Sequence, residues 1–139
     1  MINLKILKTL AFLLLIACFA IQANNNTAVG YRTLYLNSTG TSNTAVGANA
    51  LDANNTASFN TAVGHEALKT NSNAGQSTAV GDQAAKVSNA NDTTAFGFQA
   101  LLATVAQQNT GIGSKALLTN SNGISNTALG YTSGTNNVA

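Results

Sequence analysis

Few residues of this sequence could do chemistry. His65 is the only histidine, and Glu66 follows it directly. A histidine beside a carboxylate suggests acid–base catalysis, but adjacent side chains of a strand point to opposite faces. No nucleophile or second carboxylate recurs beside them, so the convergent geometry of a catalytic site is not expected. We therefore predict that both side chains are solvated and that the protein is not an enzyme.

Metal and cofactor sites are not expected either. A single histidine cannot make a zinc site, and the carboxylates Asp52, Asp82 and Asp92 lack the spacing of a calcium loop. The Gly-Ile-Gly triplet at 111–113 lacks the third glycine and the strand-to-helix context of a nucleotide-binding loop. The sequence thus predicts no catalytic residue, no metal ligand and no cofactor.

The first residues have the layout of a secretory signal peptide. Lys5 and Lys8 precede the apolar run TLAFLLLIACFAI at 9–21, and Ala23 stands before a polar stretch. The run is shorter than the roughly 20 residues that span a bilayer, so we expect no transmembrane anchor. We predict a signal peptide at 1–23 with cleavage after Ala23, and export to the medium or the outer cell surface.

A second interpretation of this segment stays open. Leu15 to Cys18, with the sequence LIAC, is similar to a bacterial lipobox, in which the cysteine would carry a lipid anchor. The apolar run continues after Cys18, where lipoproteins usually turn polar, and this favours free secretion.

Without residues 1–23 the chain is electrically neutral. The six lysines and arginines fall to four, which balance the four carboxylates. No basic patch is left for nucleic acid. Residues 24–139 also contain no cysteine, so neither disulfides nor a thiolate metal site can stabilise them.

An internal repeat runs through residues 26 to about 134. The segment NTAVG occurs at 26–30, 43–47 and 60–64, and four related segments follow. The glycine that closes each segment recurs at a constant spacing, except that two of the repeats are one residue shorter, at Gly30, Gly47, Gly64, Gly81, Gly97, Gly113 and Gly130. Seven repeats in phase indicate a repeat architecture.

Two positions of each repeat are large and apolar. The first stands directly before the glycine, at Val29, Val46, Val63, Val80, Phe96, Ile112 and Leu129. The second stands four residues after most of the glycines, at Leu34, Leu51, Leu68, Leu101 and Leu117. We expect both sets to form buried columns. Since side chains alternate along a strand, the threonine two positions before each residue of the first set should also point inward.

A period of about 17 residues suits one coil of a β-solenoid. We predict an all-β fold, a parallel β-solenoid of seven coils that fills residues 24–139 as one domain. Asparagines open most repeats and recur seven residues after most glycines, and we expect them at corners, because asparagine tolerates left-handed backbone and can bond its own turn. The one-residue contraction of two repeats follows the second asparagine and should shorten a loop. With only two large apolar residues per coil, a single chain has little core, so we expect an oligomer.

The stretch NTAVGYRTLYLNSTGTSNTAVGANAL at 26–51 resembles the head repeats of trimeric autotransporter adhesins, the YadA-like group. The resemblance covers the repeat region. It implies a left-handed parallel β-roll, assembled as a homotrimer on the cell surface, that binds host or environmental surfaces. The coils of this chain are longer than the family's, and neither a heptad stalk nor a membrane-anchor segment follows in the printed sequence.

Three functions remain open. The first is a secreted or surface-exposed adhesin-like module that presents its variable residues, with a surface or glycan as ligand. Tyr31, Phe98 and Tyr131 would then be surface contacts, or they would cover gaps between neighbouring chains. The second is a subunit of an extracellular fibre, and the third is an ice- or crystal-binding solenoid. Inward threonines argue against the third, and the polar last repeat, which resembles a cap, favours the first over the second.

Overall fold

The computed structural model describes residues 24–137, with side chains through Thr135. The expected signal peptide and Cys18 lie outside the described residues. The chain forms two parallel sheets and, within the described residues, no helix. Seven strands build the main sheet: β1 (Thr27–Val29), β2 (Thr44–Val46), β3 (Thr61–Val63), β4 (Thr78–Val80), β6 (Thr94–Phe96), β8 (Thr110–Ile112) and β10 (Thr127–Leu129). The second sheet has four: β5 (Val87–Ser88), β7 (Ala103–Thr104), β9 (Thr119–Asn120) and β11 (Asn136–Asn137).

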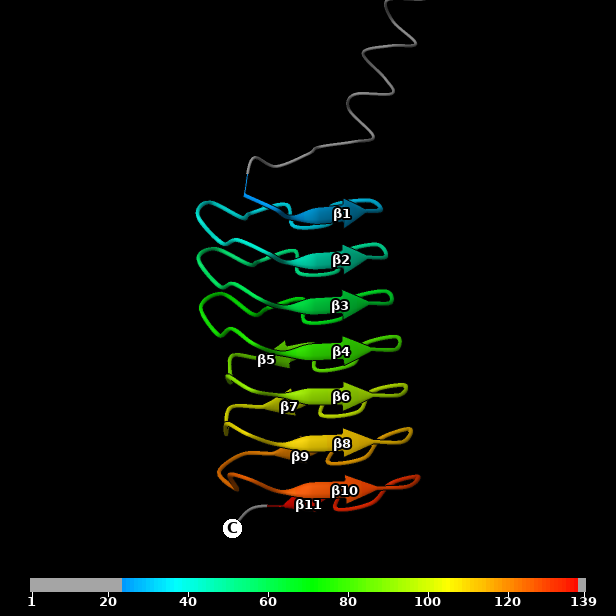
Figure 1. Ribbon diagram of the computed structural model, residues 1–139. Coiled ribbons are helices and arrows are strands. Elements are labelled where there is room, and N and C mark those ends of the chain that lie inside the picture. Colours follow the sequence, from blue (N-terminus) through cyan, green and yellow to red (C-terminus); the bar gives the residue numbers. More distant parts are fainter. Residues whose placement is uncertain (1–23, 138–139) are drawn as a thin grey trace, which may run out of the picture.

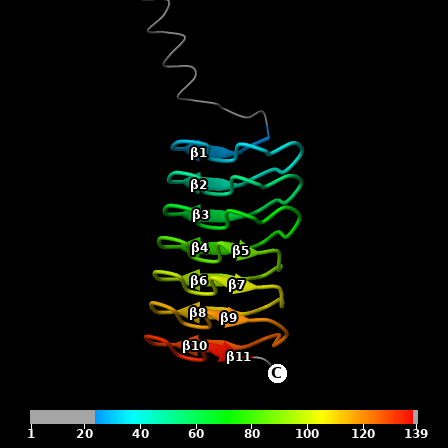
Figure 2. The same ribbon diagram turned by 180° about the vertical axis from the view of Figure 1, so that it is seen from behind.

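The strands of the main sheet are stacked in sequence order, β1-β2-β3-β4-β6-β8-β10, each parallel to the next (Figure 1). The register pairs Thr27 with Thr44 and Val29 with Val46, and every later step repeats it. The second sheet lies behind the main sheet in the lower coils, as the reverse view shows (Figure 2). The predicted parallel β-solenoid of stacked coils is thus confirmed.

The two shortened repeats keep this register. Thr78 pairs with Thr94 in the main sheet, and Val87 pairs with Ala103 in the second sheet. The missing residue therefore lies in the connection that leads back from the second sheet to the main sheet, which is the loop where the sequence places it.

The glycine after each main-sheet strand is required by its backbone. Gly81 has φ +134°, which side-chain-bearing residues rarely adopt, and a Cβ atom there would lie 2.6 Å from the carbonyl oxygen of Gly97 in the next coil. Gly47 repeats the geometry, with 2.6 Å to the oxygen of Gly64. The glycines therefore permit both the turn and the close approach of successive coils.

Left-handed residues other than glycine recur in each coil, but they are not the asparagines of the repeat. They are the second and fourth residues after each glycine, such as Glu66 (φ 56°) and Leu68 (φ 50°), and the residue before the first asparagine, such as Phe59 (φ 62°). The prediction of left-handed backbone at the asparagines is wrong. The prediction that asparagines bond their own turns is confirmed for the second set, and the side chains of the first set bond in the interior.

In most coils, one asparagine links its coil to the next. Asn60 donates its backbone N–H to Oδ1 of Asn43 (2.9 Å), and Nδ2 of Asn43 donates to the carbonyl of Ala57 (2.8 Å). The same bond from backbone N–H to asparagine Oδ1 joins three other pairs: Asn43 to Asn26, Ser77 to Asn60, and Asn126 to Asn109. A second set closes a turn three residues on, as where Asn71 donates to the carbonyl of Ala74 (2.7 Å). Each satisfied bond contributes about 1 kcal/mol net.

Small residues and leucines fill the interior. The middle residue of most main-sheet strands is a buried alanine or glycine: Ala45, Ala62, Ala79, Ala95, Gly111 and Ala128. A second buried column is Ala50, Ala67, Ala84, Ala100 and Ala116. Beside it lies a column of fully buried leucines, Leu34, Leu51, Leu68, Leu101 and Leu117, with Ala85 in the fourth coil. The leucine column of the sequence analysis is therefore part of the core.

The other predicted column is wrong. Val29, Val46, Val63, Val80, Phe96, Ile112 and Leu129 point outward together with the threonines. Val29 is 53% exposed and Leu129 is 75% exposed, while the three middle valines are half-buried.

The interior is too narrow for these residues. Gly111 occupies an inward position, and a Cβ atom there would lie 3.1 Å from the carbonyl oxygen of Ala116 and 3.2 Å from Cγ of Leu101. Space for even one methyl group is therefore tight, and a valine would overlap the opposite wall. Steric fit thus turns alanine inward and the larger apolar residue outward.

Replacement of Gly81 by alanine should destabilise the protein by about 3 kcal/mol, because the new Cβ combines left-handed strain with overlap of the next coil. Gly130→Ala is the matched control. Gly130 has φ +117°, but a Cβ atom there meets nothing within 4 Å, so only the strain of about 1 kcal/mol remains. Urea unfolding followed by circular dichroism measures both. Equal losses of stability in Gly81→Ala and Gly130→Ala would contradict the tight contact between coils.

Candidate functional site

The outward side of the main sheet is the candidate functional site. We call it the Thr–Val face, and it consists of two parallel rows, one residue of each row per strand. The first row is Thr27, Thr44, Thr61, Thr78, Thr94, Thr110 and Thr127; the second is Val29, Val46, Val63, Val80, Phe96, Ile112 and Leu129. With strands about 4.8 Å apart, each row is roughly 30 Å long.

The Thr–Val face carries no charge. None of its residues is ionisable, and Val29, Phe96, Ile112 and Leu129 are exposed large hydrophobic side chains. Because the strands are in register, these apolar side chains form one continuous row along the sheet. Such patches on a soluble domain mark contacts with another surface.

The two rows differ in regularity. The threonine row is unbroken through all seven strands, whereas the apolar row is valine in β1 to β4 and then Phe96, Ile112 and Leu129. The first four strands therefore repeat the same threonine–valine pair, whereas the size of the apolar side chain varies in the last three.

Charge is concentrated beside this face, on the turn edge. The turn edge comprises the five residues after each glycine: 31–35, 48–52, 65–69, 82–86, 98–102, 114–118 and 131–135. Arg32 and Asp52 form an ion pair there (3.3 Å), and Glu66 binds two lysines. Asp92, just before β6, is the only acidic side chain of the sequence outside the turn edge.

Glu66 joins two coils. Its Oε1 lies 2.6 Å from Nζ of Lys69, and its Oε2 lies 2.6 Å from Nζ of Lys86 in the next coil. Hydrogen bonds from Lys69 and Lys86 lower the pKa of Glu66 from 4.5 to about 2. The carboxylate therefore stays charged and acts as an electrostatic link between neighbouring coils.

His65 and Glu66 are not directed at each other. Nδ1 of His65 lies 3.3 Å from Oδ1 of Asp82 in the next coil, and both side chains are about half exposed. Glu66 is occupied by its lysines. Within residues 24–137, no group of three or more His, Cys, Asp or Glu residues could hold a metal ion.

The three predicted surface aromatics lie on the turn edge. Tyr31 and Tyr131 are 74% exposed, and Phe98 is 43% exposed. They belong to the first, fifth and seventh coils, so they do not form one patch. Phe98 lies under the ammonium group of Lys115, 6.0 Å from the ring centre. Sequence reasoning missed Tyr35, which lies beneath the guanidinium of Arg32 at 4.7 Å.

The fold and the face define a β-solenoid with one uncharged, partly apolar sheet surface. No protein-family model, curated protein or solved structure matches the chain. None of the residues that the structure describes forms a helix with the length and apolarity needed to cross a bilayer.

The Glu66 link predicts a loss of stability in acid. Because the folded protein lowers the pKa of Glu66 to about 2, its contribution is complete above pH 4.5 and disappears as the pH falls toward 2. Its partners are partly exposed, so we expect about 1 kcal/mol.

Thermal unfolding of the protein and of Glu66→Gln between pH 2 and 7 measures this contribution. The wild-type protein should have the higher Tm at pH 6, and the difference should vanish near pH 2. A difference in Tm that does not change with pH would contradict the assignment.

Proposed function

We propose that the protein is an extracellular, adhesin-like structural and binding module that works as a homo-oligomer. The Thr–Val face packs against the same face of neighbouring subunits, and the turn edge presents the variable side chains outward. Export through the predicted signal peptide brings the module to the medium or the cell surface.

The observation that carries this proposal is the uncharged apolar row on the Thr–Val face. Every coil contributes one large apolar side chain to it, and the interior has no room for that side chain. Association would remove these side chains from water, at roughly 25 cal/mol per Å² of apolar surface. The change from valine to Phe96, Ile112 and Leu129 suits packing between irregular protein surfaces.

A homotrimer is the assembly that the resemblance to adhesin heads implies. Three rods that lie side by side around a common axis would each turn one face inward and one edge outward. Tyr31, Phe98 and Tyr131, which are exposed on the turn edge, would then remain available for a surface or glycan ligand. Aromatic side chains suit such contacts because they give a large area with little loss of entropy.

The direct test of this assembly is Val63→Asp. Val63 points outward, so the coil should still fold, but a charge in the middle of the face would be desolvated in the assembly. Sedimentation velocity at micromolar concentration should give a laterally associated oligomer for the wild-type protein and loss of that lateral association for Val63→Asp, with the same circular dichroism spectrum.

Ser114→Asp is the matched control, because it places the same charge on the turn edge and should leave the oligomer intact. A wild-type protein that is monomeric and folded at micromolar concentration would contradict the proposal. So would an oligomer that Val63→Asp leaves unchanged.

The outward threonine row supports a second candidate, binding to ice or another crystal lattice. Threonines that point inward could not contact a lattice, but in the structure they share the outward face with the valines. In β1 to β4 the threonine and valine rows repeat regularly, as an array that matches a lattice would. Phe96, Ile112 and Leu129 interrupt that regularity, so we rank this candidate second.

Thermal hysteresis separates the two candidates. The adhesin proposal expects no depression of the freezing point beyond the colligative effect, for either the wild-type protein or Thr61→Tyr, in a nanolitre osmometer. Hysteresis in the wild-type protein that Thr61→Tyr abolishes would move the assignment to the second candidate.

A further inference from the structure

The same two backbone bonds join every coil to the next, at the start of the main-sheet strand and at its end, and a third bond, to an asparagine side chain, joins most of the coils. Thr44 donates its N–H to the carbonyl of Asn60 (2.8 Å), and Gly64 donates its N–H to the carbonyl of Val46 (2.8 Å). Asn60 donates its N–H to Oδ1 of Asn43 (2.9 Å). Each coil therefore offers a threonine N–H and an apolar residue's carbonyl to its successor, and most coils also offer an asparagine Oδ1.

The last coil offers this set at the C-terminal end of the rod. Thr127 N–H, the carbonyl of Leu129 and Oδ1 of Asn126 occupy the positions that earlier coils use to bind a successor. Nδ2 of Asn126 is buried and has no hydrogen-bond partner among the described residues. A buried polar group of this kind is costly unless something binds it.

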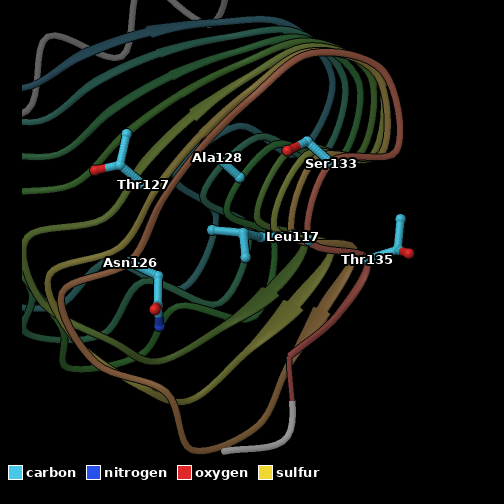
Figure 3. Close-up of a pocket in the computed structure, with 7 residues that line it drawn as sticks. Leu117, Asn126, Thr127, Ala128, Ser133 and Thr135 are labelled. Atoms are coloured by element: carbon cyan, nitrogen blue, oxygen red, sulfur yellow. The ribbon is translucent and has the colours of Figure 1, made fainter.

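A hollow lies at the same end. Its volume is about 530 Å³, and Leu117, Asn126, Ala128 and Gly134 line part of it. Figure 3 looks onto this end and shows Leu117 and Ala128 inside the coil, with the side chain of Thr135 directed outward. Gly134 stands where most coils have their core leucine, so the hollow is larger than a complete coil would leave.

The first coil has the complementary set. Thr27 N–H and the carbonyl of Val29 bind the second coil, so the carbonyl of Asn26 and the N–H of Gly30 point away from it, toward the N-terminal end. In every later coil the corresponding carbonyl and glycine N–H bind the preceding coil, and in most of them the backbone N–H at the asparagine position does so as well. Cleavage after Ala23, as the sequence predicts, would leave this end open.

We propose that the C-terminal end of the rod binds the N-terminal coil of a second copy of this chain, head to tail, in the register of the internal coils. Thr127 would donate to the carbonyl of Asn26, Gly30 to the carbonyl of Leu129, and Asn26 to Oδ1 of Asn126. This contact is axial and does not depend on lateral assembly through the Thr–Val face. Repeated, it makes a filament.

The terminal coils carry few of the charged residues and prolines that usually protect open sheet edges. Residues 121–139 contain no charged side chain and no proline, and Arg32 is the one charged side chain of the first coil. Edge strands that stay unpaired usually carry charges, prolines or bulges. The last coil, which we expected to be a cap, is therefore better suited to binding a successor.

Paired cysteines test the proposed register. In-register strands lie about 4.8 Å apart, within the Cα separation of a disulfide. A chain that carries Thr27→Cys and Thr127→Cys cannot close on itself, because the two sites lie at opposite ends of the rod (Figure 1). Mild oxidation should link it into a ladder of multiples on a non-reducing gel.

The matched control carries Thr27→Cys and Thr132→Cys. Thr132 is exposed on the same last coil but lies on the turn edge, out of register with Thr27, so no ladder should form. The parent chain shows any contribution of Cys18. Absence of the ladder in the first variant, or an equal ladder in the control, would overturn the proposal.

Thr127→Pro provides an independent test by removal of the edge N–H. That N–H has no acceptor among residues 24–137, so the variant should fold with an unchanged Tm, yet filaments in negative-stain micrographs should be lost. Filaments that persist in Thr127→Pro would overturn the proposal. Thr110→Pro, which removes the bond from Thr110 to the carbonyl of Asn126 (2.8 Å), should lower the Tm instead.

These experiments distinguish a wrong axial contact from a wrong lateral contact. If Val63→Asp still forms the cysteine ladder but loses lateral association, both contacts are supported. If the ladder is absent while the wild-type protein is a discrete oligomer, the axial contact is refuted and the proposed function stands.

Discussion

The close approach of one coil to the next is the constraint on which the rest of the structure depends. At each turn the α-carbon of a glycine lies against the carbonyl group of the glycine in the following coil, with no space for a side chain. Because this contact involves backbone alone, it fixes the register of neighbouring coils without regard to the variable residues between. The ladder of Thr–Thr and Val–Val pairs follows from it, as does the line of buried asparagines.

The same compactness explains why the larger apolar residues are outside. Each coil encloses two columns of alanine and one of leucine, and Gly111 shows how little volume remains. Apolar residues that the interior excludes must face solvent or a partner. The Thr–Val face is therefore a direct result of the cross-section of the coil, and its lack of charge makes it suitable for association.

The period, the strands, the leucine column and the shortened loop could be predicted from the sequence, because each depends on spacing alone. The direction of the valines could not be predicted from alternation, which defines two faces without saying which is inside. Because the valines are larger and more apolar than the alanines, they were expected on the inner face, and this expectation was wrong. A signal was present, however: the middle strand position varies only between alanine and glycine, whereas the valine position also holds Phe96, Ile112 and Leu129. Restricted size marks the confined side, and tolerance of size marks the open one.

The links that the asparagines make between coils were not predicted from the sequence, for a different reason. Their tolerance of left-handed backbone suggested corners, but Ser77 and Thr93 replace them in the middle coils. Serine and threonine can replace asparagine as a hydrogen-bonding side chain, but they tolerate the left-handed region less well. In the structure, Ser77 donates to the carbonyl of Ala90 (3.1 Å) and accepts from the N–H of Thr93 (3.2 Å), which preserves the link.

The links between coils also affect how such a gene can change. Side-chain and backbone bonds between coils join residues 13 to 20 positions apart, and strands pair only with the neighbouring coils. An unequal crossover between two copies of the repeat would therefore insert or delete one complete coil and leave every remaining contact in register. Each event would change the length of the rod by one strand spacing, about 4.8 Å. Recombination can thus adjust the length of the rod in equal steps, without a new fold.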